Sequence, residues 1–233
     1  MNSDISRMIE LQRFWDTVLR CREEIRKAGE SIEYWKGRVD ECTRRVASLA
    51  ESIKLLKSSI GAREVDLATL EEKIARLEAR KDSVKTEREA AAVQTELATA
   101  TSERGALEEE ILLHMEELES KNAALAAAEK EAEEVRKQSE TDIAMLEERI
   151  GRFTAQMDEH RARFDEGVSN LSAAVRPKFL KLTGTGNGKA IVRIDGETCE
   201  GCRVKVPVHL AGDVSKQDKV ISCSNCGRFI YGG

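Results

Sequence analysis

The sequence predicts a mainly α protein, a long antiparallel two-helix coiled-coil hairpin followed by a small β zinc ribbon. Both prolines, Pro177 and Pro207, lie in the last quarter of the 233 residues, so 176 residues run without a helix breaker. Apolar residues recur through this stretch at alternating spacings of three and four, the pattern of a coiled coil. Four cysteines near the C-terminus form two C-x2-C pairs, which is typical of a zinc ribbon.

The first part of the apolar repeat predicts one continuous helix. From Leu11 to Val84, apolar residues occupy two positions of every seven, and only Arg63 and Lys81 interrupt them. A strict seven-residue repeat keeps the apolar stripe facing a partner helix and implies a left-handed supercoil. At 1.5 Å of rise per residue, this helix would span roughly 110 Å.

A second repeat predicts the partner helix within the same chain. It runs from Val93 to Val175, with four-residue steps that shift the stripe locally. The pattern breaks near residues 81–87, and there Thr86 and Glu89 fit the capping box that opens a helix. Two helices of similar length therefore predict a hairpin with its turn at this break.

The sequence leaves a competing turn open at residues 101–105, where serine and glycine occur together. If the turn lies near residue 85, an antiparallel register places Phe14 beside Phe153 and Met157. On this reading the hairpin occupies residues 1–176, and the aromatic side chains gather at its open end.

Residues 177–189 are expected to form a flexible linker. They include the glycine-rich run 184–189, which superficially resembles a phosphate-binding loop. The resemblance fails because Thr183 stands where the motif needs glycine and Ala190 where it needs a hydroxyl. Gly-rich composition without that motif favours a linker.

The remaining residues, 190–233, are expected to form the zinc ribbon. Short alternating or apolar runs flank the cysteine pairs and predict three or four brief strands. About 45 residues are too few for a self-sufficient core, so the metal would hold these strands together. The expected strands are Ala190–Ile194, Arg203–Val206, Val220–Ser222 and Phe229–Tyr231.

The expected metal ligands are Cys199, Cys202, Cys223 and Cys226, with twenty residues between the pairs. Two such turns complete the tetrahedron that zinc adopts with sulfur ligands. Because four thiolates fill every position, one structural zinc ion per chain is expected, with no place for an activated water. Redox chemistry at these pairs would require a βαβ context, and the sequence around them shows none.

Composition restricts the classes of protein that the chain can belong to. Aromatic residues make up 4% and charged residues 35%, which argues against an ordinary large globular core. Residues 1–176 carry a net charge of −9 and residues 177–233 a net charge of +4. The charge of the C-terminal part is therefore compatible with nucleic-acid binding but does not by itself predict it. No signal peptide or membrane span is evident, and a cytoplasmic, non-membrane protein is expected.

The layout resembles a bacterial family with an N-terminal coiled-coil hairpin and a C-terminal four-cysteine zinc ribbon. The resemblance covers nearly the full chain and rests on Cys199-Glu-Gly-Cys202, on the closing segment Cys223–Tyr231 and on Val84–Glu89. Family members often have proline where this chain has Ser224. The resemblance implies that the four cysteines bind zinc and that the protein is a non-enzymatic accessory factor. It connects such proteins to flagellar or type III secretion assembly and to the alternative sigma factor of the nitrogen class.

The leading functional hypothesis is an adaptor or chaperone that presents protein-binding surfaces, because a two-stranded coil offers no cavity for a small substrate. We expect no enzymatic activity. Candidate partner-binding residues are Arg203, Lys205, Arg228 and Tyr231, which combine charge with aromatic area. The alternative is a nucleic-acid-binding zinc ribbon that uses Arg203, Lys205, Lys219 and Arg228 on phosphates, with the coiled coil as a spacer. The sequence does not predict the oligomeric state.

Overall fold

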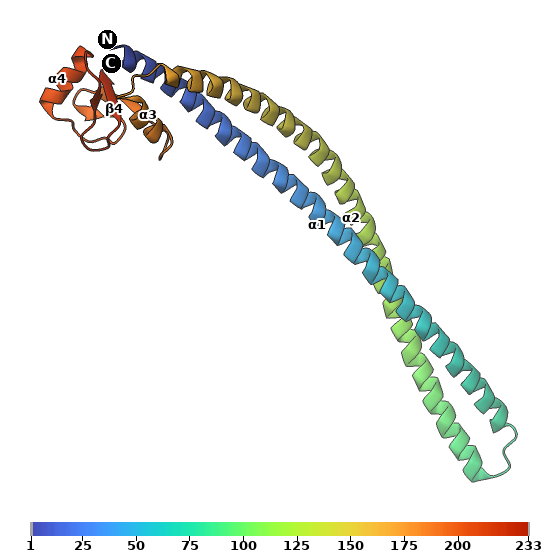
Figure 1. The fold of residues 1–233 in the computed structure, drawn as a ribbon. Helices are drawn as coiled ribbons and strands as arrows, with labels where there is room; N and C mark the ends of the chain where they lie inside the picture. The colour runs from blue at the N-terminus through green and yellow to red at the C-terminus, as the bar shows by residue number, and fades with distance from the viewer. Residues whose placement is uncertain (1, 233) are drawn as a thin grey trace. The chain divides into compact units, whose positions relative to one another are not determined.

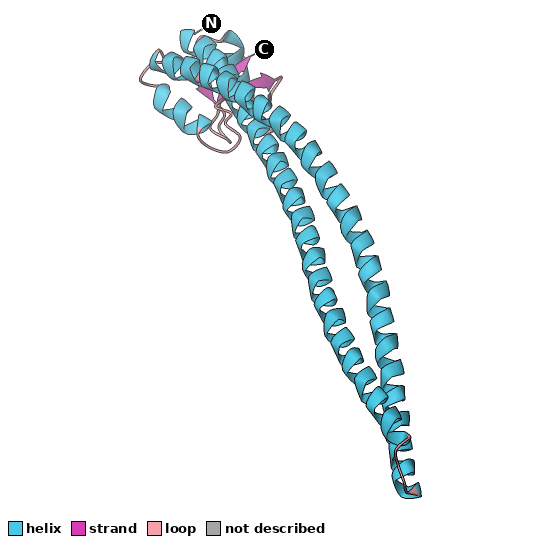
Figure 2. Ribbon diagram, turned by 90° about the vertical axis from the view of Figure 1, so that its right-hand side faces the viewer, coloured by secondary structure: helices cyan, strands magenta, loops and turns pink. Residues whose placement is uncertain are grey.

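The computed structural model describes residues 2–232, and it confirms the predicted mainly α fold class. Helices α1 (Ser3–Lys81) and α2 (Glu87–Ser169) run antiparallel and pack side by side (Figure 1). A small region of short strands follows in the C-terminal part of the chain (Figure 2). Over the described residues, no helix combines the length and the apolar character that crossing a bilayer requires.

The chain divides into two compact units. The ribbon unit comprises residues 1–33 and 142–233, so it contains the start of α1, the end of α2 and everything that follows. The hairpin unit comprises residues 34–141 and contains only the two long helices and their connection. All residues that concern the metal site and its surroundings belong to the ribbon unit.

The predicted seam of α1 is the side that the helix buries. Leu11, Val18, Ile32, Ile53, Ile60 and Ile74 are each at most 8% exposed. Arg63, which interrupts the seam, forms an ion pair with Glu110 of α2 in the hairpin unit. The charged residue thus finds an opposite charge across the hairpin instead of an apolar neighbour.

The connection between the long helices covers residues 82–86, and Thr86 caps α2. The backbone N–H of Glu89 donates to the Thr86 hydroxyl at 3.3 Å, and that hydroxyl donates to the Glu89 carboxylate at 2.8 Å. The competing turn at residues 101–105 lies within α2, which is continuous there.

The expected register was wrong by more than one helical turn. Phe14 lies against His160, with ring centroids 5.6 Å apart, although the cluster around Phe14 does include Met157. In the hairpin unit, Arg45 bonds to Glu131 at 2.9 Å, which shows a displacement in the same direction. The prediction assumed a symmetric turn, whereas the connection lets α2 begin beyond the last turn of α1 (Figure 1).

Residues 177–189 do not form a flexible linker. Helix α3 (Arg176–Thr183) occupies the first half, and its Phe179 is fully buried in the core of the ribbon unit. The Trp15 indole N–H donates to the carbonyl of Thr183 at 3.1 Å. Gly188, with φ of 70°, lies so close to Leu19 and to the Trp15 ring that a Cβ there would clash. Packing against α1 therefore orders a segment whose composition alone favours flexibility.

Four short strands form one sheet in the order β2-β1-β4-β3. The central pair is parallel, and each outer strand is antiparallel to its neighbour. The strands are β1 (Ile191–Asp195), β2 (Thr198–Cys199), β3 (Ile221–Ser222) and β4 (Phe229–Gly232). The strand expected at Arg203–Val206 is reduced to one bridge between Thr198 and Lys205, because Arg203 has a left-handed backbone with φ of 60°. A helix that the sequence reading missed, α4 (Val208–Lys216), follows instead.

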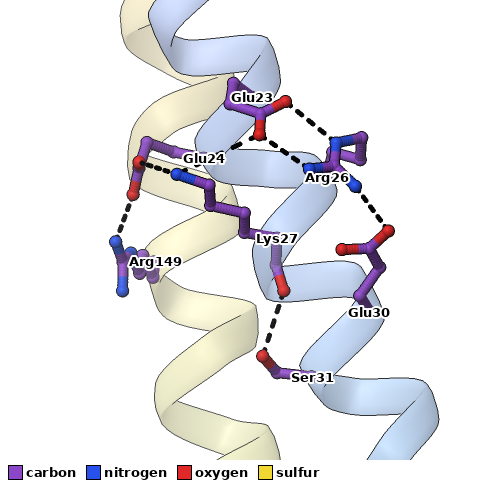
Figure 3. Close-up of polar contacts among 7 residues, drawn as sticks. All are labelled: Glu23, Glu24, Arg26, Lys27, Glu30, Ser31 and Arg149. Atoms are coloured by element: carbon purple, nitrogen blue, oxygen red, sulfur yellow. Dashed lines mark hydrogen bonds and ion pairs between the residues drawn. The ribbon is translucent and has the colours of Figure 1, made fainter.

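Mixed charge covers the outer faces of the long helices. In Figure 3, Arg26 bonds to Glu23 and Glu30 along α1, while Arg149 of α2 reaches Glu24. The hydrogen bond from Arg26 lowers the pKa of the exposed Glu23. Exposed pairs of this kind contribute little to stability, so the helices depend mainly on their apolar seam.

Candidate metal centre

The four predicted ligands meet at one point in the ribbon unit. The Sγ atoms of Cys199, Cys202, Cys223 and Cys226 all lie within 4.8 Å of one another. Cys199 and Cys226 are separated by 3.9 Å between sulfurs, and Cys202 and Cys223 by 3.8 Å. A tetrahedron with zinc–sulfur bonds of about 2.3 Å has sulfur–sulfur edges of about 3.8 Å. The thiols therefore fit one zinc ion, and with four sulfur ligands its role would be structural.

Each cysteine pair lies on a turn with the same backbone pattern. In the first turn, the N–H of Arg203 donates to the carbonyl of Cys199 at 2.7 Å, and the N–H of Cys199 donates to Val204 at 3.1 Å. In the second, the N–H of Gly227 donates to Cys223 at 2.9 Å, and the N–H of Cys223 donates to the Arg228 carbonyl at 2.8 Å. The second cysteine of each pair precedes a residue in the left-handed region.

Left-handed geometry explains one glycine of the site, and close packing explains another. Gly227 has φ of 73°, a conformation that glycine adopts without a Cβ clash. At the equivalent place in the first turn the residue is Arg203, not Gly201. Gly201 instead lies in a tightly packed place, because a Cβ there would be 3.0 Å from the Arg228 side chain and 3.2 Å from the Val192 side chain.

The surroundings of the sulfurs act on their pKa values in opposite directions. Burial raises the pKa of the Cys199 thiol to about 12, although backbone N–H groups of Cys202 and Gly201 act against it. A hydrogen bond from Asn225, assisted by the Val204 N–H, lowers the pKa of Cys202 to about 6. Donors aimed at sulfur stabilise thiolates, the form that binds metal.

Arg228, expected at a partner surface, is instead bonded inside the ribbon unit. Its guanidinium donates to the carbonyls of Lys189 and Gly201, each at 3.0 Å, and to the side chain of Asn187 at 3.2 Å. These bonds connect the two cysteine turns to the glycine-rich loop. Arg228 is therefore a structural link, and the structure gives it no free donor fork for a partner.

The other candidate partner residues lie in two different places. Arg203 and Lys205 are exposed on the segment that leaves the first cysteine turn. Tyr231 is half-buried and packs against the apolar cluster formed with the long helices. The structure therefore does not bring the four candidates together into one surface.

Sequence reasoning missed Gln12, which is 6% exposed and holds the start of the ribbon against α1. Its side-chain oxygen accepts from the N–H of Ala190 at 2.7 Å and of Ile191 at 3.3 Å, and its Nε2 donates to the Gly188 carbonyl at 3.0 Å. The sequence did offer one indication of this role, since Gln12 is an uncharged polar residue next to the buried seam residue Leu11.

Solved structures share this fold over nearly the whole chain. The structure of CT398 from Chlamydia trachomatis has a TM-score of 0.89 at 17% identity and covers 99% of this chain and 98% of its own. HP0958 from Helicobacter pylori reaches 0.67 at 18% identity, with 99% and 98% covered. A protein from Mycobacterium smegmatis reaches 0.55 at 18% identity, with 97% and 98% covered. At these identities the likeness concerns the fold alone.

Sequence comparison adds information only at the metal centre. No curated protein sequence matches the chain. The model of the C4-type zinc ribbon domain matches residues 198–230, which contain all four cysteines and both turns. The C-terminal part of this protein is thus a C4-type zinc ribbon.

Proposed function

We propose that this protein is a non-enzymatic adaptor or chaperone that binds other proteins through its zinc ribbon. The observation that carries the proposal is the exposed segment Arg203–His209. Val204 is 43% exposed and Val208 70%, although most apolar side chains of the ribbon are buried. Arg203 and Lys205 are exposed beside them and have no internal side-chain partner in the described part of the chain.

The first cysteine turn fixes this segment at several points. The Val206 side chain is 3% exposed, and its N–H donates to the carbonyl of Glu197 at 2.7 Å. The carbonyl of Val204 accepts from the N–H of Cys199, a zinc ligand. A surface held by the metal site loses little conformational entropy on binding, which favours recognition.

The chemistry of the metal supports a role without catalysis. Four thiolates complete the tetrahedral coordination of zinc, so the ion would hold the fold and would not polarise a substrate. The family resemblance suggests components of flagellar or type III secretion systems, or the nitrogen-class sigma factor, as partners. We also propose that the protein acts in the cytoplasm, where reduced thiols persist.

A second candidate function is nucleic-acid binding by the same ribbon. Arg203, Lys205 and Lys219 are exposed and could reach phosphates. The net charge of −9 on residues 1–176 opposes a polyanion, so we place this function second.

Affinity capture from native extract, with and without nuclease, tests both. A defined set of proteins that survives nuclease supports the adaptor, and loss of all partners supports nucleic acid. The double variant Arg203→Glu/Lys205→Glu should lose these partners while retaining one zinc per chain. Arg22→Glu, an equally exposed change on α1, should retain them. If the double variant captures every partner as well as the parent, the segment Arg203–His209 is not the docking surface.

A further inference from the structure

A pocket of about 290 Å³ lies where α1 meets the ribbon. It is formed entirely within the ribbon unit, by one face of α1, the glycine-rich loop, β1, the first cysteine turn and β4. The pocket is separate from the segment Arg203–His209, none of whose residues lines it. Its polar lining includes Arg13, Asp16, Lys189, Arg193, Glu200 and Tyr231.

The positive charges of this lining are not all used internally. The Lys189 ammonium pairs with Asp16 at 2.6 Å. Arg13 and Arg193 are exposed, and in the part of the chain that the structure describes neither guanidinium has a side-chain partner. Three cations and two carboxylates, those of Asp16 and Glu200, leave the lining with a small positive excess.

Two unpaired guanidinium groups suit a carboxylate ligand. The planar fork of arginine matches a carboxylate with two parallel hydrogen bonds. The acidic groups in the lining would repel the dense charge of a nucleic-acid backbone but tolerate a single carboxylate. Ile9 and Tyr231 add apolar and aromatic wall, which suits a neighbouring apolar side chain.

The walls of the pocket are fixed before any ligand arrives. Gln12 ties the loop and the start of β1 to α1, and Arg228 ties the loop to the first cysteine turn. Along β1, Ile191 belongs to the core shared with the long helices, so Arg193, two residues on, emerges on the same side of the sheet. A rigid site of this kind reduces the entropy lost on binding.

We propose that this pocket binds an acidic segment of a protein partner, with one aspartate or glutamate carboxylate placed between Arg13 and Arg193. The inference rests on the proposed adaptor function and adds to it the chemistry of the partner. It assigns recognition of a single carboxylate to the pocket, in addition to the contacts that the segment Arg203–His209 makes.

The test uses a defined probe, the peptide acetyl-Leu-Asp-Asp-Leu-amide, titrated into the zinc-loaded full chain and followed by backbone NMR. Saturable shifts at Arg193, Gly201 and Tyr231 are expected. The uncharged peptide acetyl-Leu-Asn-Asn-Leu-amide should not produce them. Arg13→Gln or Arg193→Gln should each weaken binding about tenfold or more, the usual effect of losing a charged hydrogen bond. Arg22→Gln, at an exposed arginine of α1 outside both the pocket lining and the segment Arg203–His209, is the matched control and should not change the affinity.

Three results would overturn the proposal: no saturable binding of the acidic peptide, equal binding of both peptides, or equal binding by the arginine variants and the parent. A single-stranded oligonucleotide that binds with the same arginine dependence, while the peptide does not, would assign the pocket to nucleic acid instead. Failure here leaves partner capture through Arg203–His209 intact. Failure of that capture, with peptide binding retained, would remove the proposed docking surface and keep the pocket.

Discussion

Replacing Arg228 by alanine should open the zinc ribbon locally while leaving the long helices folded. The substitution removes three hydrogen bonds from a charged donor and strips two backbone carbonyls, those of Lys189 and Gly201, of this partner. Because the residue is half-buried and water can partly replace the bonds, we expect a loss of about 2–3 kcal/mol. A local probe should detect this loss of stability only in the ribbon unit, since all three acceptors lie there.

Hydrogen exchange measures this loss directly, because it reports opening of individual segments. The informative amides are those of Phe229, which bonds to Ala190 at 2.9 Å, and Cys199, which bonds to Val204 at 3.1 Å. A loss of about 2–3 kcal/mol lowers their protection by roughly 30- to 150-fold. Arg228→Lys should give an intermediate result, since an ammonium reaches fewer of the acceptors. Lys219→Ala, an exposed control, should change nothing. Parental protection of both amides in Arg228→Ala would refute the structural role.

Four further expectations follow from the same contacts. Gln12→Ala should destabilise the ribbon unit by about 2–4 kcal/mol, because it leaves buried backbone groups at Gly188 and Ala190 unpaired, and a fall in thermal midpoint would show it. Gly227→Ala should lower the stability of the ribbon by about 1–2 kcal/mol, because residue 227 has a φ of 73°, and faster loss of zinc to a chelator would show it. Gly37→Ala, on an open helix surface, should instead raise the stability of the helix by about 0.5–1 kcal/mol. At pH 7, zinc binding should release the proton of Cys199, whose pKa is raised to about 12, whereas Cys202, whose pKa is lowered to about 6, is mostly thiolate already. The affinity for zinc should therefore fall as the pH falls. Calorimetry in buffers of different ionisation enthalpy would measure both the proton release and the change in affinity. Ile53→Asp should lower the helical melting midpoint, because it places an unpaired charge on the buried seam of α1.

The long helices and the metal ligands were readable from the sequence because both depend on local spacing. A seven-residue repeat determines which side of a helix is apolar without reference to the rest of the fold. Two C-x2-C pairs likewise determine their own turns, and Cys199 and Cys226 meet as the spacing predicts. The cap at Thr86 is local in the same sense.

The elements that were missed depend on contacts between distant parts of the chain. Helix α3 is short and forms where Phe179 enters a core built by α1 and α2. No local sequence pattern predicts that packing. The register error arose because an antiparallel pairing depends on how the connection is built. Helix α4 did leave a signal, since Pro207 precedes it and Leu210, Ala211 and Val214 fall at helical spacing toward the sheet.

The role of Arg228 could not be predicted for a related reason. In a sequence, a basic residue beside a cysteine turn looks the same whether its charge faces solvent or backbone carbonyls. Only the fold shows that Lys189 and Gly201 lie within reach of its guanidinium. Arg203, with similar sequence surroundings, keeps its side chain free.

The two faces of the small sheet pack against different parts of the protein, and this limits how much of the ribbon depends on zinc for its stability. On β4, Phe229 packs with the long helices, while Ile230 packs with the residues around the cysteines. On β1, Ile191 and Val192 divide in the same way. Loss of zinc removes support from one face only, so the central parallel pair keeps its apolar contacts with α1 and α2. The expectation that the metal alone holds the strands of residues 190–233 together therefore gives way to a narrower one. In Cys199→Ser, the cysteine turns and α4 should lose exchange protection first, while β1 and β4 retain part of theirs.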